Sequence, residues 1–315
     1  MGIKVLFTYD YGTDNMESIA RLGYDIVVLK EQGLKYNESI SDTEVLVCYN
    51  PFESLDLSCF KYLKWIQLSS IGIDQLPINY LNSSSIVVTN NKGGYSIPMG
   101  EWIVLKILEL LKKSREFYEN QNKKLWRINT NVLELFGKTI GFIGTGSIAF
   151  EAAKRLQGFD VKVLGLNTTG KEVDFFQKCF KTEDIDLMLP LCDVVVVTIP
   201  STTETYHLIN QNRISKMKTG AIIINVARGN IIDESALNFS IESGKLSGAA
   251  LDVFEEEPLG SESPLWKHDN VIITPHNSWV SEKRNKRRFE NIFENLKRYS
   301  KGRNLINIVD IKKGY

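Results

Sequence analysis

The sequence lacks an excess of charge of either sign. Of its 315 residues, 38 are Lys or Arg and 38 are Asp or Glu, so the formal net charge at pH 7 is zero. Proteins that attract nucleic acid or anionic lipid through a bulk field carry a surplus of positive charge. We therefore expect neither a nucleic acid nor a membrane as partner, and the balance favours a small molecule.

Long apolar runs and paired cysteine motifs are also missing. No stretch approaches the roughly 18 apolar residues of a membrane-spanning helix, and the first ten residues hold a short strand-like run with one Lys. Cys48, Cys59, Cys179 and Cys192 show no C-x-x-C spacing, which argues against a zinc site and a disulfide framework. We expect reduced thiols, no metal and a cytoplasmic location.

What the sequence does contain is a regular alternation of short apolar runs with helical stretches. In the first third the runs cover residues 4–8, 25–29, 44–48, 65–68 and 87–88. In the second half they cover residues 139–143, 161–166, 194–199, 221–225, 249–253 and 271–274. This pattern predicts an α/β fold with parallel sheets. We expect a Rossmann-type doubly wound domain with six strands and a smaller flavodoxin-like βα domain.

Two helical patterns suggest how the chain is divided. After Pro98, apolar residues follow an i, i+4, i+7, i+8 rhythm typical of a long helix, which we expect to carry the chain between domains: Ile103, Ile107, Leu110 and Leu111. Residues 281–300 are charged and amphipathic and predict a second helix, with Phe289, Ile292, Phe293 and Leu296 on its apolar side. We expect a discontinuous substrate domain of residues 1–97 and 283–315 and a dinucleotide-binding domain of residues 98–282.

A glycine motif directly follows the run at 139–143. It reads G-x-G-x-x-A between a strand and a helical stretch and comprises Gly144, Thr145, Gly146, Ser147, Ile148 and Ala149. Gly144 permits a tight turn, Gly146 lets a pyrophosphate approach the backbone, and Ala149 allows close packing. The N-terminus of the following helix offers N–H groups and partial positive charge to phosphates. A structural turn is the alternative, but the strand-to-helix setting favours a dinucleotide site.

The end of the next run bears on the choice between NAD and NADP. An NAD-specific site usually places a carboxylate on the ribose about twenty residues after the glycines, but this chain has Asn167, Thr168 and Thr169 there, with Lys171 close by. No carboxylate would repel a 2′-phosphate, and these groups can donate hydrogen bonds to one. We expect a preference for NADP(H) over NAD(H); the alternative is a relaxed NAD site with an ordinary polar turn.

Three ionisable residues follow three successive runs: Arg228, Glu257 and His276. The carboxyl ends of parallel strands form the ligand-binding edge of such a sheet. An imidazole suits proton transfer at neutral pH, a carboxylate on its other nitrogen fixes the ring and favours its protonated form, and a guanidinium can bridge a carboxylate and a keto oxygen. Surface charge is the simpler alternative for each, and we expect His207 and His268 to be solvated.

The sequence around these residues resembles the D-isomer-specific 2-hydroxyacid dehydrogenase family. The resemblance rests on NVARG at 225–229, DVFEEEP at 252–258 and TPH at 274–276, together with SSIGID at 69–74, MKTGA at 217–221 and NIVD at 307–310. It covers essentially the whole chain. It implies an NAD(P)-dependent oxidoreductase that interconverts a D-2-hydroxy acid and its 2-keto acid.

The resemblance also implies roles for individual residues. Arg228, Glu257 and His276 match the catalytic Arg, Glu and His, and the loop of Ser70, Ile71 and Gly72 would hold the substrate carboxylate together with Arg228 and His276. Asp252 would contact the nicotinamide carboxamide; the alternative for an Asp at a strand end is a helix N-cap. The other residues implied beside the cofactor are Pro200, Thr205, Val226, Ala227, Arg228 and His276. A homodimer through the long helix after Pro98 and its surroundings is implied as well.

The substrate stays open at this stage. We expect a reductase of small 2-keto acids such as glyoxylate or hydroxypyruvate if Trp279 narrows the pocket, and phenylpyruvate-like acids if it forms an aromatic platform. No basic cluster is evident near Ser69 or Tyr95, which disfavours phosphoglycerate. Two alternatives remain: a corepressor that uses the dinucleotide site as a sensor, and a formate or phosphite dehydrogenase, against which the intact Glu257 and His276 argue.

Overall fold

The computed structural model describes residues 2–315, which fold into two compact units. The first unit comprises the chain up to Tyr95 together with Ser281–Tyr315, and the second comprises Ser96–Val280. The sequence analysis placed the two domain boundaries after residues 97 and 282. Each lies two residues beyond the boundary in the structure. Each unit is described by itself below.

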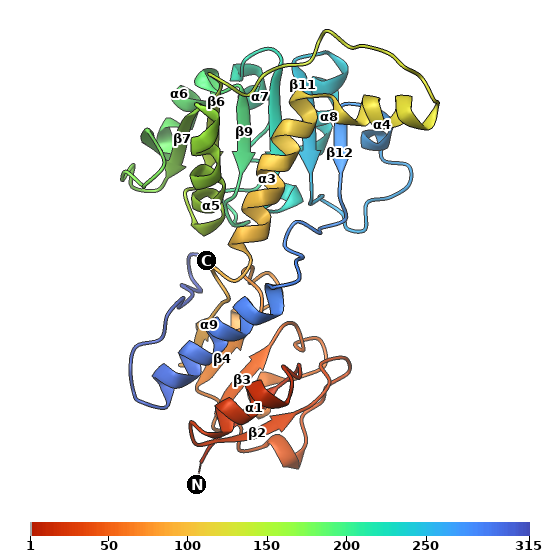
Figure 1. The fold of residues 1–315 in the computed structure, drawn as a ribbon. Helices are drawn as coiled ribbons and strands as arrows, with labels where there is room; N and C mark the ends of the chain where they lie inside the picture. The colour runs from red at the N-terminus through yellow and green to blue at the C-terminus, as the bar shows by residue number, and fades with distance from the viewer. Residues whose placement is uncertain (1) are drawn as a thin grey trace. The chain divides into compact units, whose positions relative to one another are not determined.

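A five-stranded parallel sheet forms the core of the first unit, in the order β2-β1-β3-β4-β5 (Figure 1). Its strands are β1 (Ile3–Phe7), β2 (Tyr24–Val28), β3 (Val45–Cys48), β4 (Trp65–Leu68) and β5 (Val87–Thr89). This is the strand order of the flavodoxin-like fold, as expected. Every residue of β3 and β4 is buried, which explains why the sequence shows unbroken runs there rather than alternation.

The described residues of this unit also form the α-helices α1 (Thr13–Ala20), α2 (Ile78–Asn82) and α9 (Arg284–Tyr299). The inner faces of α1 and α9 pack against the same side of the sheet, and the two helices lie side by side (Figure 1). On α9 the buried apolar residues are Phe289, Ile292 and Leu296. The amphipathic helix predicted over residues 281–300 is therefore confirmed, with its ends at Arg284 and Tyr299.

A buried polar network joins α9 to the sheet. Asn295, only 1% exposed, donates to Gln67 Oε1 over 2.8 Å and exchanges hydrogen bonds with the backbone of Ile306 at 3.0 and 2.8 Å. Gln67 Oε1 also accepts from Thr89, whose hydroxyl accepts from the Trp65 indole. Because each polar group has a partner, these side chains can lie in the core of the unit.

The second unit contains a seven-stranded parallel sheet in the order β12-β11-β10-β9-β6-β7-β8. Its strands are β6 (Thr139–Ile143), β7 (Lys162–Asn167), β8 (Lys178–Lys181), β9 (Val194–Val197), β10 (Ala221–Asn225), β11 (Leu246–Leu251) and β12 (Val271–Ile273). The doubly wound architecture is as predicted, but the expected number of six strands was wrong. The missed strand, β8, is a four-residue edge strand with Lys at both ends and one buried residue, so it shows no apolar run.

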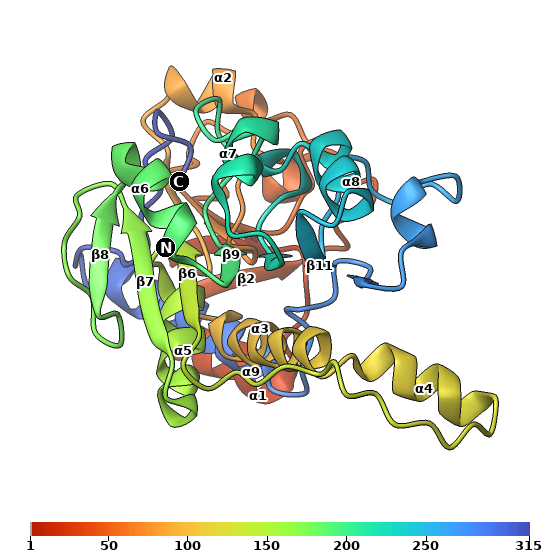
Figure 2. The same cartoon turned by 90° about the horizontal axis from the view of Figure 1, so that it is seen from above.

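The α-helices of the second unit are α3 (Ser96–Leu111), α4 (Ser114–Asn122), α5 (Ser147–Leu156), α6 (Ile185–Met188), α7 (Gln211–Lys216) and α8 (Glu234–Glu242). The long helix expected after Pro98 is α3, which begins at Ser96. Pro98 is tolerated because the first turn of a helix has no internal partner for its N–H. Figures 1 and 2 show α3 lying alongside α5, which it contacts over much of its length.

The segment after α3 projects from the sheet as an arm. Figure 2 shows α4 extending away from the rest of the second unit before the chain returns to β6. No residue of α4 is buried. The loop that follows exposes large apolar side chains: Leu125 at 52%, Trp126 at 100%, Ile128 at 82% and Phe136 at 69%. The arm therefore carries apolar surface that this chain does not cover itself.

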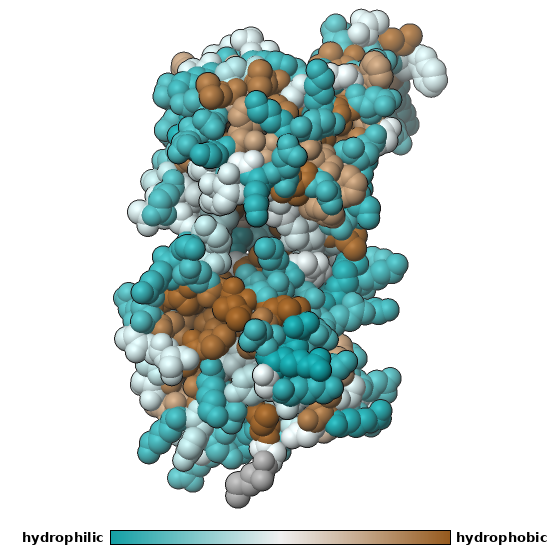
Figure 3. All heavy atoms as spheres, turned by 90° about the vertical axis from the view of Figure 1, so that its left-hand side faces the viewer, coloured by the Kyte–Doolittle hydropathy of each residue, from teal (hydrophilic) through white to brown (hydrophobic). Residues whose placement is uncertain are grey.

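Elsewhere the surface is mixed in character. On the face drawn in Figure 3 hydrophilic side chains predominate, with apolar atoms gathered in separate patches, one of them on the smaller unit. Among residues 2–315, no helix combines the length and the apolar character needed to cross a bilayer. The four cysteines are free thiols, and Cys48 and Cys192 are buried.

The Asn295 network predicts a large effect of a small substitution. Asn295→Ala should lower the free energy of unfolding by about 2–4 kcal/mol, because Gln67 and the Ile306 backbone would be left buried without their partner. Urea unfolding followed by circular dichroism measures this loss. Asn304→Ala, at an exposed position, is the control and should change stability by less than about 0.5 kcal/mol. An equal effect of both substitutions would contradict the role given to Asn295.

Candidate active site

The topology of the second unit brings the predicted residues to one edge of its sheet. The strand order reverses at β6, which has β7 on one side and β9 on the other. In doubly wound sheets ligands bind beyond the carboxyl ends of the strands at such a switch point. The glycine motif follows β6, Pro200 comes after β9, and Arg228, Asp252 and His276 follow β10, β11 and β12. All these segments therefore leave the sheet at the same edge.

The glycine motif has the geometry that a pyrophosphate needs. Gly144 has a φ of 98°, and a Cβ there would lie 2.8 Å from Ile199 Cγ2, so a larger residue is excluded on both grounds. Gly146 is the N-cap of α5, and a Cβ there would meet nothing within 4 Å. Ala149 is fully buried against the sheet. The start of α5 thus presents backbone N–H groups to open space, which fits a phosphate group.

The turn after β7 is built by Asn167. Its Nδ2 donates to Thr145 Oγ1 and to the Lys171 carbonyl, and its Oδ1 accepts from the backbone N–H and hydroxyl of Thr169. Thr168, Thr169 and Lys171 are exposed on the turn. The side chain of Asn167 itself is thus engaged within the protein, and the polar groups that remain accessible are two hydroxyls and an ammonium group.

Two further loops border the edge. After β9, Thr205 holds the turn that contains Pro200 by donating to the Pro200 carbonyl and accepting from the Thr202 N–H. After β10, Asn225 bridges the turn of Val226 and Ala227: its Oδ1 accepts from Ala227 N–H and its Nδ2 donates to the Arg228 carbonyl. Val226 and Ala227 are buried, so their side chains support the turn while their backbone follows the edge.

Close packing fixes the turn that carries Arg228. Gly229 follows it, and a Cβ at Gly229 would lie 1.8 Å from the carbonyl carbon of Phe254. The backbone of this turn is therefore in contact with the segment that leads from β11 to Glu257. Arg228 itself is half-buried, and its Nη1 donates to the Ala227 carbonyl over 2.7 Å. A side-chain methyl group at position 229 would separate the two loops.

His276 and Glu257 form the pair that the sequence predicted. His276 Nδ1 lies 2.8 Å from Glu257 Oε2, while the other carboxylate oxygen accepts from the Phe254 N–H over 3.0 Å. The carboxylate is thereby fixed at both oxygens. Since Nδ1 is occupied, Nε2 is the ring atom left to exchange a proton with a ligand. The two side chains are 41% and 37% exposed, so the pair is accessible from solvent.

The backbone of His276 is held in an unusual conformation by Asp252. His276 has a φ of 49°, in the left-handed region that L-residues rarely adopt. Its N–H donates to the Asp252 carbonyl over 2.8 Å. The Asp252 carboxylate, fully buried, accepts from Thr274 Oγ1 at 2.5 Å, Asn277 N–H at 2.8 Å and Ser278 N–H at 2.9 Å. Asp252 is therefore neither a helix cap nor a surface charge but the anchor of the His276 loop.

The sequence had predicted that the other two histidines are solvated, but each ring has a partner within the protein. His207 Nε2 lies 3.0 Å from Glu255 Oε1, and its ring stacks on Tyr206. His268 Nε2 lies 2.8 Å from Asn238 Oδ1. The Glu255 N–H also donates to the Glu234 carboxylate. Burial raises the pKa of Glu234, and the charges of Glu255 and Glu257 act in the same direction. These partners come from distant segments, which no local pattern could indicate.

The predicted carboxylate loop lies in the first unit, directly after β4. Its carbonyls face the protein: Asn91 N–H donates to Ser70 O, Asn90 Nδ2 to Ile71 O, and Ser70 Oγ to Gly72 O. In the part of the chain from residue 2 onward, the N–H groups of Ile71 and Gly72 have no hydrogen-bond acceptor. Consecutive unpaired N–H groups of this kind can hold an anion.

Comparison with known proteins agrees with this geometry. The family model for the D-isomer specific 2-hydroxyacid dehydrogenase NAD binding domain matches residues 104–278, more than half of the chain. The chain belongs to the D-isomer specific 2-hydroxyacid dehydrogenase family. The resemblance stated from the sequence is thereby confirmed, together with the expected fold class.

Relatives and solved structures extend the match. A glyoxylate reductase of Thermofilum pendens is 37% identical over 248 residues, which span 76% of this chain and 73% of that protein. A D-3-phosphoglycerate dehydrogenase of Archaeoglobus fulgidus is 39% identical over 217 residues, 69% of this chain but only 41% of that longer protein. A crystal structure of a family member from Xanthobacter autotrophicus Py2, in complex with NADPH and MES, has a TM-score of 0.85 at 26% identity, with full coverage of both chains.

The Asp252 anchor predicts that its amide analogue fails. In Asp252→Asn one of the three donors would face an NH₂ group, so we expect the His276 loop to be displaced. As a result kcat should fall at least about 100-fold, which corresponds to the loss of a buried, charged hydrogen bond. Steady-state kinetics and a separate titration of cofactor affinity measure this.

Thr274→Val is the matched control for Asp252→Asn. It removes one of the three donors and keeps both backbone hydrogen bonds, so kcat should fall by no more than about tenfold. Wild-type kcat in Asp252→Asn, or a loss explained wholly by weaker cofactor binding, would show that Asp252 does not position the loop.

Proposed function

We propose that this protein is an NAD(P)H-dependent reductase of small 2-keto acids that forms D-2-hydroxy acids. In the reaction a hydride passes from the cofactor to the keto carbon and a proton to the keto oxygen, giving the hydroxy acid and oxidised cofactor. The observation that carries the proposal is the His276–Glu257 pair, held at the same sheet edge as Arg228 and the glycine loop. The glyoxylate reductase activity of the Thermofilum pendens relative supports the same reaction class.

His276 is the proton donor in this proposal. Its Nδ1 is bonded to Glu257, so a protonated ring presents Nε2–H to the keto oxygen. The Glu257 charge stabilises that protonated ring and fixes its orientation. In the reverse direction the same nitrogen accepts the hydroxyl proton.

Arg228 and the loop after β4 bind the substrate in this proposal. The guanidinium of Arg228 polarises the keto group and pairs with the substrate carboxylate, for which its planar set of donors is suited. The unpaired N–H groups of Ile71 and Gly72, next to Ser70, hold the same carboxylate.

The nicotinamide cofactor, when bound, supplies the hydride. We assign its pyrophosphate to the loop from Gly144 to Ile148 and its adenosine ribose to Asn167, Thr168 and Thr169. The segments of Pro200, Thr205, Val226, Ala227 and Asp252 border the remaining length of the edge. The absence of a carboxylate at the end of β7, where Thr168, Thr169 and Lys171 are exposed, supports a preference for NADPH over NADH.

Turnover with a panel of keto acids tests the proposal. Oxidation of NADPH at 340 nm should be observed with at least one acid among glyoxylate, hydroxypyruvate, pyruvate and phenylpyruvate, with kcat/KM higher for NADPH than for NADH. His276→Gln should lower kcat by about 100- to 10,000-fold, the range for loss of a general acid. His268→Gln, remote from the edge, should not.

Two results would contradict this proposal. Consumption of neither cofactor by a protein that still binds NADPH would favour a cofactor sensor over an enzyme. Near-normal turnover by His276→Gln would remove the proton-donor assignment.

We further propose that the protein is a cytoplasmic homodimer joined through the arm. Support for a dimer comes from the apolar residues of the arm, Trp126 and Ile128 above all, which are almost fully exposed in the single chain. The free thiols support a reducing compartment.

The mass of the protein in solution tests the dimer. Light scattering after gel filtration should give twice the chain mass for the wild type and one chain mass for Trp126→Glu/Ile128→Glu, because charge at the centre of an apolar interface opposes association. Leu187→Glu, at a 64% exposed position on α6, is the control and should remain dimeric. A monomeric wild type, or a dimeric double variant, would refute the proposal.

A further inference from the structure

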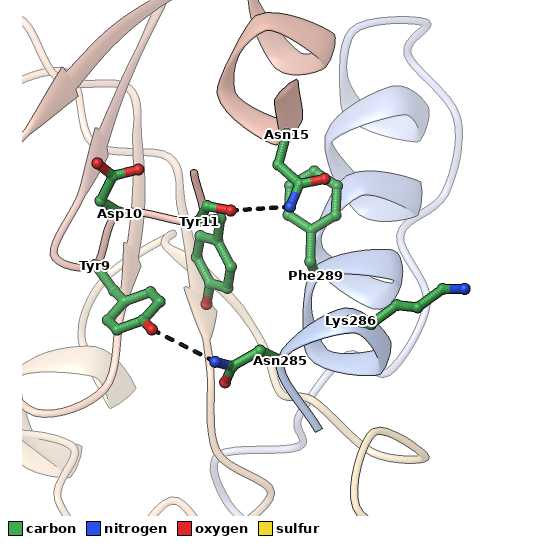
Figure 4. Close-up of a pocket in the computed structure, with 7 residues that line it drawn as sticks. All are labelled: Tyr9, Asp10, Tyr11, Asn15, Asn285, Lys286 and Phe289. Atoms are coloured by element: carbon green, nitrogen blue, oxygen red, sulfur yellow. Dashed lines mark hydrogen bonds between the residues drawn. The ribbon is translucent and has the colours of Figure 1, made fainter. Parts of the chain in front are cut away.

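Arg288 of α9 lies among tyrosines at the carboxyl edge of the smaller sheet. Its Cζ atom is 4.8 Å from the centre of the Tyr9 ring and 5.2 Å from that of Tyr11. Both tyrosines lie in the loop between β1 and α1. Figure 4 shows the Tyr9 and Tyr11 rings beside the first turns of α9, where Tyr9 is bonded to Asn285, in the wall of a cavity of about 200 Å³. Arg288 thus packs at the edge where a parallel sheet binds ligands.

Among residues 2–315 no carboxylate forms an ion pair with Arg288, although Asp10 lines the neighbouring cavity. Its Nε is buried without a hydrogen-bond partner, and its Nη2 donates to the neutral Asn285 Oδ1 at 3.3 Å. Aromatic rings attract a guanidinium but leave its charge uncompensated. Arg288 is half-buried, and a partly buried charge without a counter-ion is unfavourable, so an anion placed there would be stabilised.

This charge adjoins the loop that offers unpaired N–H groups. The buried Tyr95 hydroxyl donates to the carbonyl of Ser69, the first residue of that loop. Burial raises the pKa of Tyr95, while the charge of Arg288, a hydrogen bond with the Arg288 side chain and the charge of Arg284 act in the opposite direction. The sequence had shown no basic cluster near Ser69 or Tyr95; the structure corrects this, because α9 brings Arg288 there from 219 positions along the chain.

We propose that Arg288 determines substrate specificity by binding a second anionic group of the substrate. The preferred substrates are then 2-keto acids that carry a terminal carboxylate or phosphate, rather than uncharged side chains. This inference rests on the proposed function. A substrate held by its first carboxylate at Ile71 and Gly72 meets a second site for negative charge within the same unit.

Keto acids of equal size that differ in terminal charge test the inference. The near-isosteric pairs are oxaloacetate with 4-methyl-2-oxopentanoate and 2-oxoglutarate with 5-methyl-2-oxohexanoate. A comparison of 3-phosphohydroxypyruvate with hydroxypyruvate then separates phosphate from carboxylate. For the wild type, kcat/KM should be at least about tenfold higher for the charged member of one pair. In Arg288→Met that advantage should fall by about 10- to 100-fold, as expected for loss of a charged hydrogen bond, while the uncharged member changes less than threefold.

Two further variants separate recognition from packing and from net charge. Arg288→Lys keeps a charge without the fork of donors and should retain an intermediate preference. Arg303→Met removes the same charge from an exposed position and should leave every ratio unchanged. Turnover of the uncharged acids with no preference for charged ones, or an equal loss for both members in Arg288→Met, would overturn the inference and leave the proposed function intact.

A binding measurement keeps the two proposals distinguishable if no acid is reduced. Calorimetric titration of the NADPH-loaded protein compares tartronate, which has two carboxylates, with glycolate, which has one. Tighter binding of tartronate that is lost in Arg288→Met would support the anion site even though the proposed enzyme activity had failed. Tartronate affinity that does not depend on Arg288 would overturn the anion site.

Discussion

The hydrogen bonds of the buried Asp252 carboxylate are the interactions that fix the geometry of the sheet edge that carries His276. A carboxylate with no exposure to solvent is stable only when its oxygens are well hydrogen-bonded, and here all three donors come from the loop that carries His276. The loop gains a fixed path, and the carboxylate gains the partners it needs. The left-handed conformation of His276, which an unconstrained loop would avoid, is held by the same residue through its backbone carbonyl.

That anchor is effective because neighbouring loops cannot move independently. The parallel sheet places the ends of β10, β11 and β12 side by side. The Asp252 N–H donates to the Asn225 carbonyl, and Asn225 in turn holds the turn of Arg228. Gly229 lets that turn contact the backbone of Phe254, three residues before Glu257. Arg228, Glu257 and His276 are therefore held by one rigid support. It restricts the distances between these side chains, as a reaction with a strict geometry requires.

The sequence was informative where function and structure depend on local pattern. The buried strands, the glycine motif and the three charged residues after successive strands could all be predicted, because burial on both faces leaves unbroken apolar runs and motifs have fixed spacing. The exposed edge strand β8 could not, since the Lys at each of its ends leaves no apolar run. The partners of His207, Asp252 and Arg288 could not either, because each contact joins segments far apart in the chain. Thr274, Asn225 and Gly229 acquire their roles only once the strands are adjacent.

Several unfavourable features of the protein lie at the carboxyl edge of one sheet or the other, where ligands are expected. His276 is held in a left-handed conformation, the N–H groups of Ile71 and Gly72 have no acceptor in the described chain, and no carboxylate there forms an ion pair with Arg288. The charges of the chain balance overall. Folding favours paired groups, so it does not by itself explain why a positive charge and N–H donors at a sheet edge lack partners. An anionic ligand would supply what each of these donors lacks. Binding would then stabilise the folded state by mass action, because the anion would pair donors that folding alone leaves without a partner.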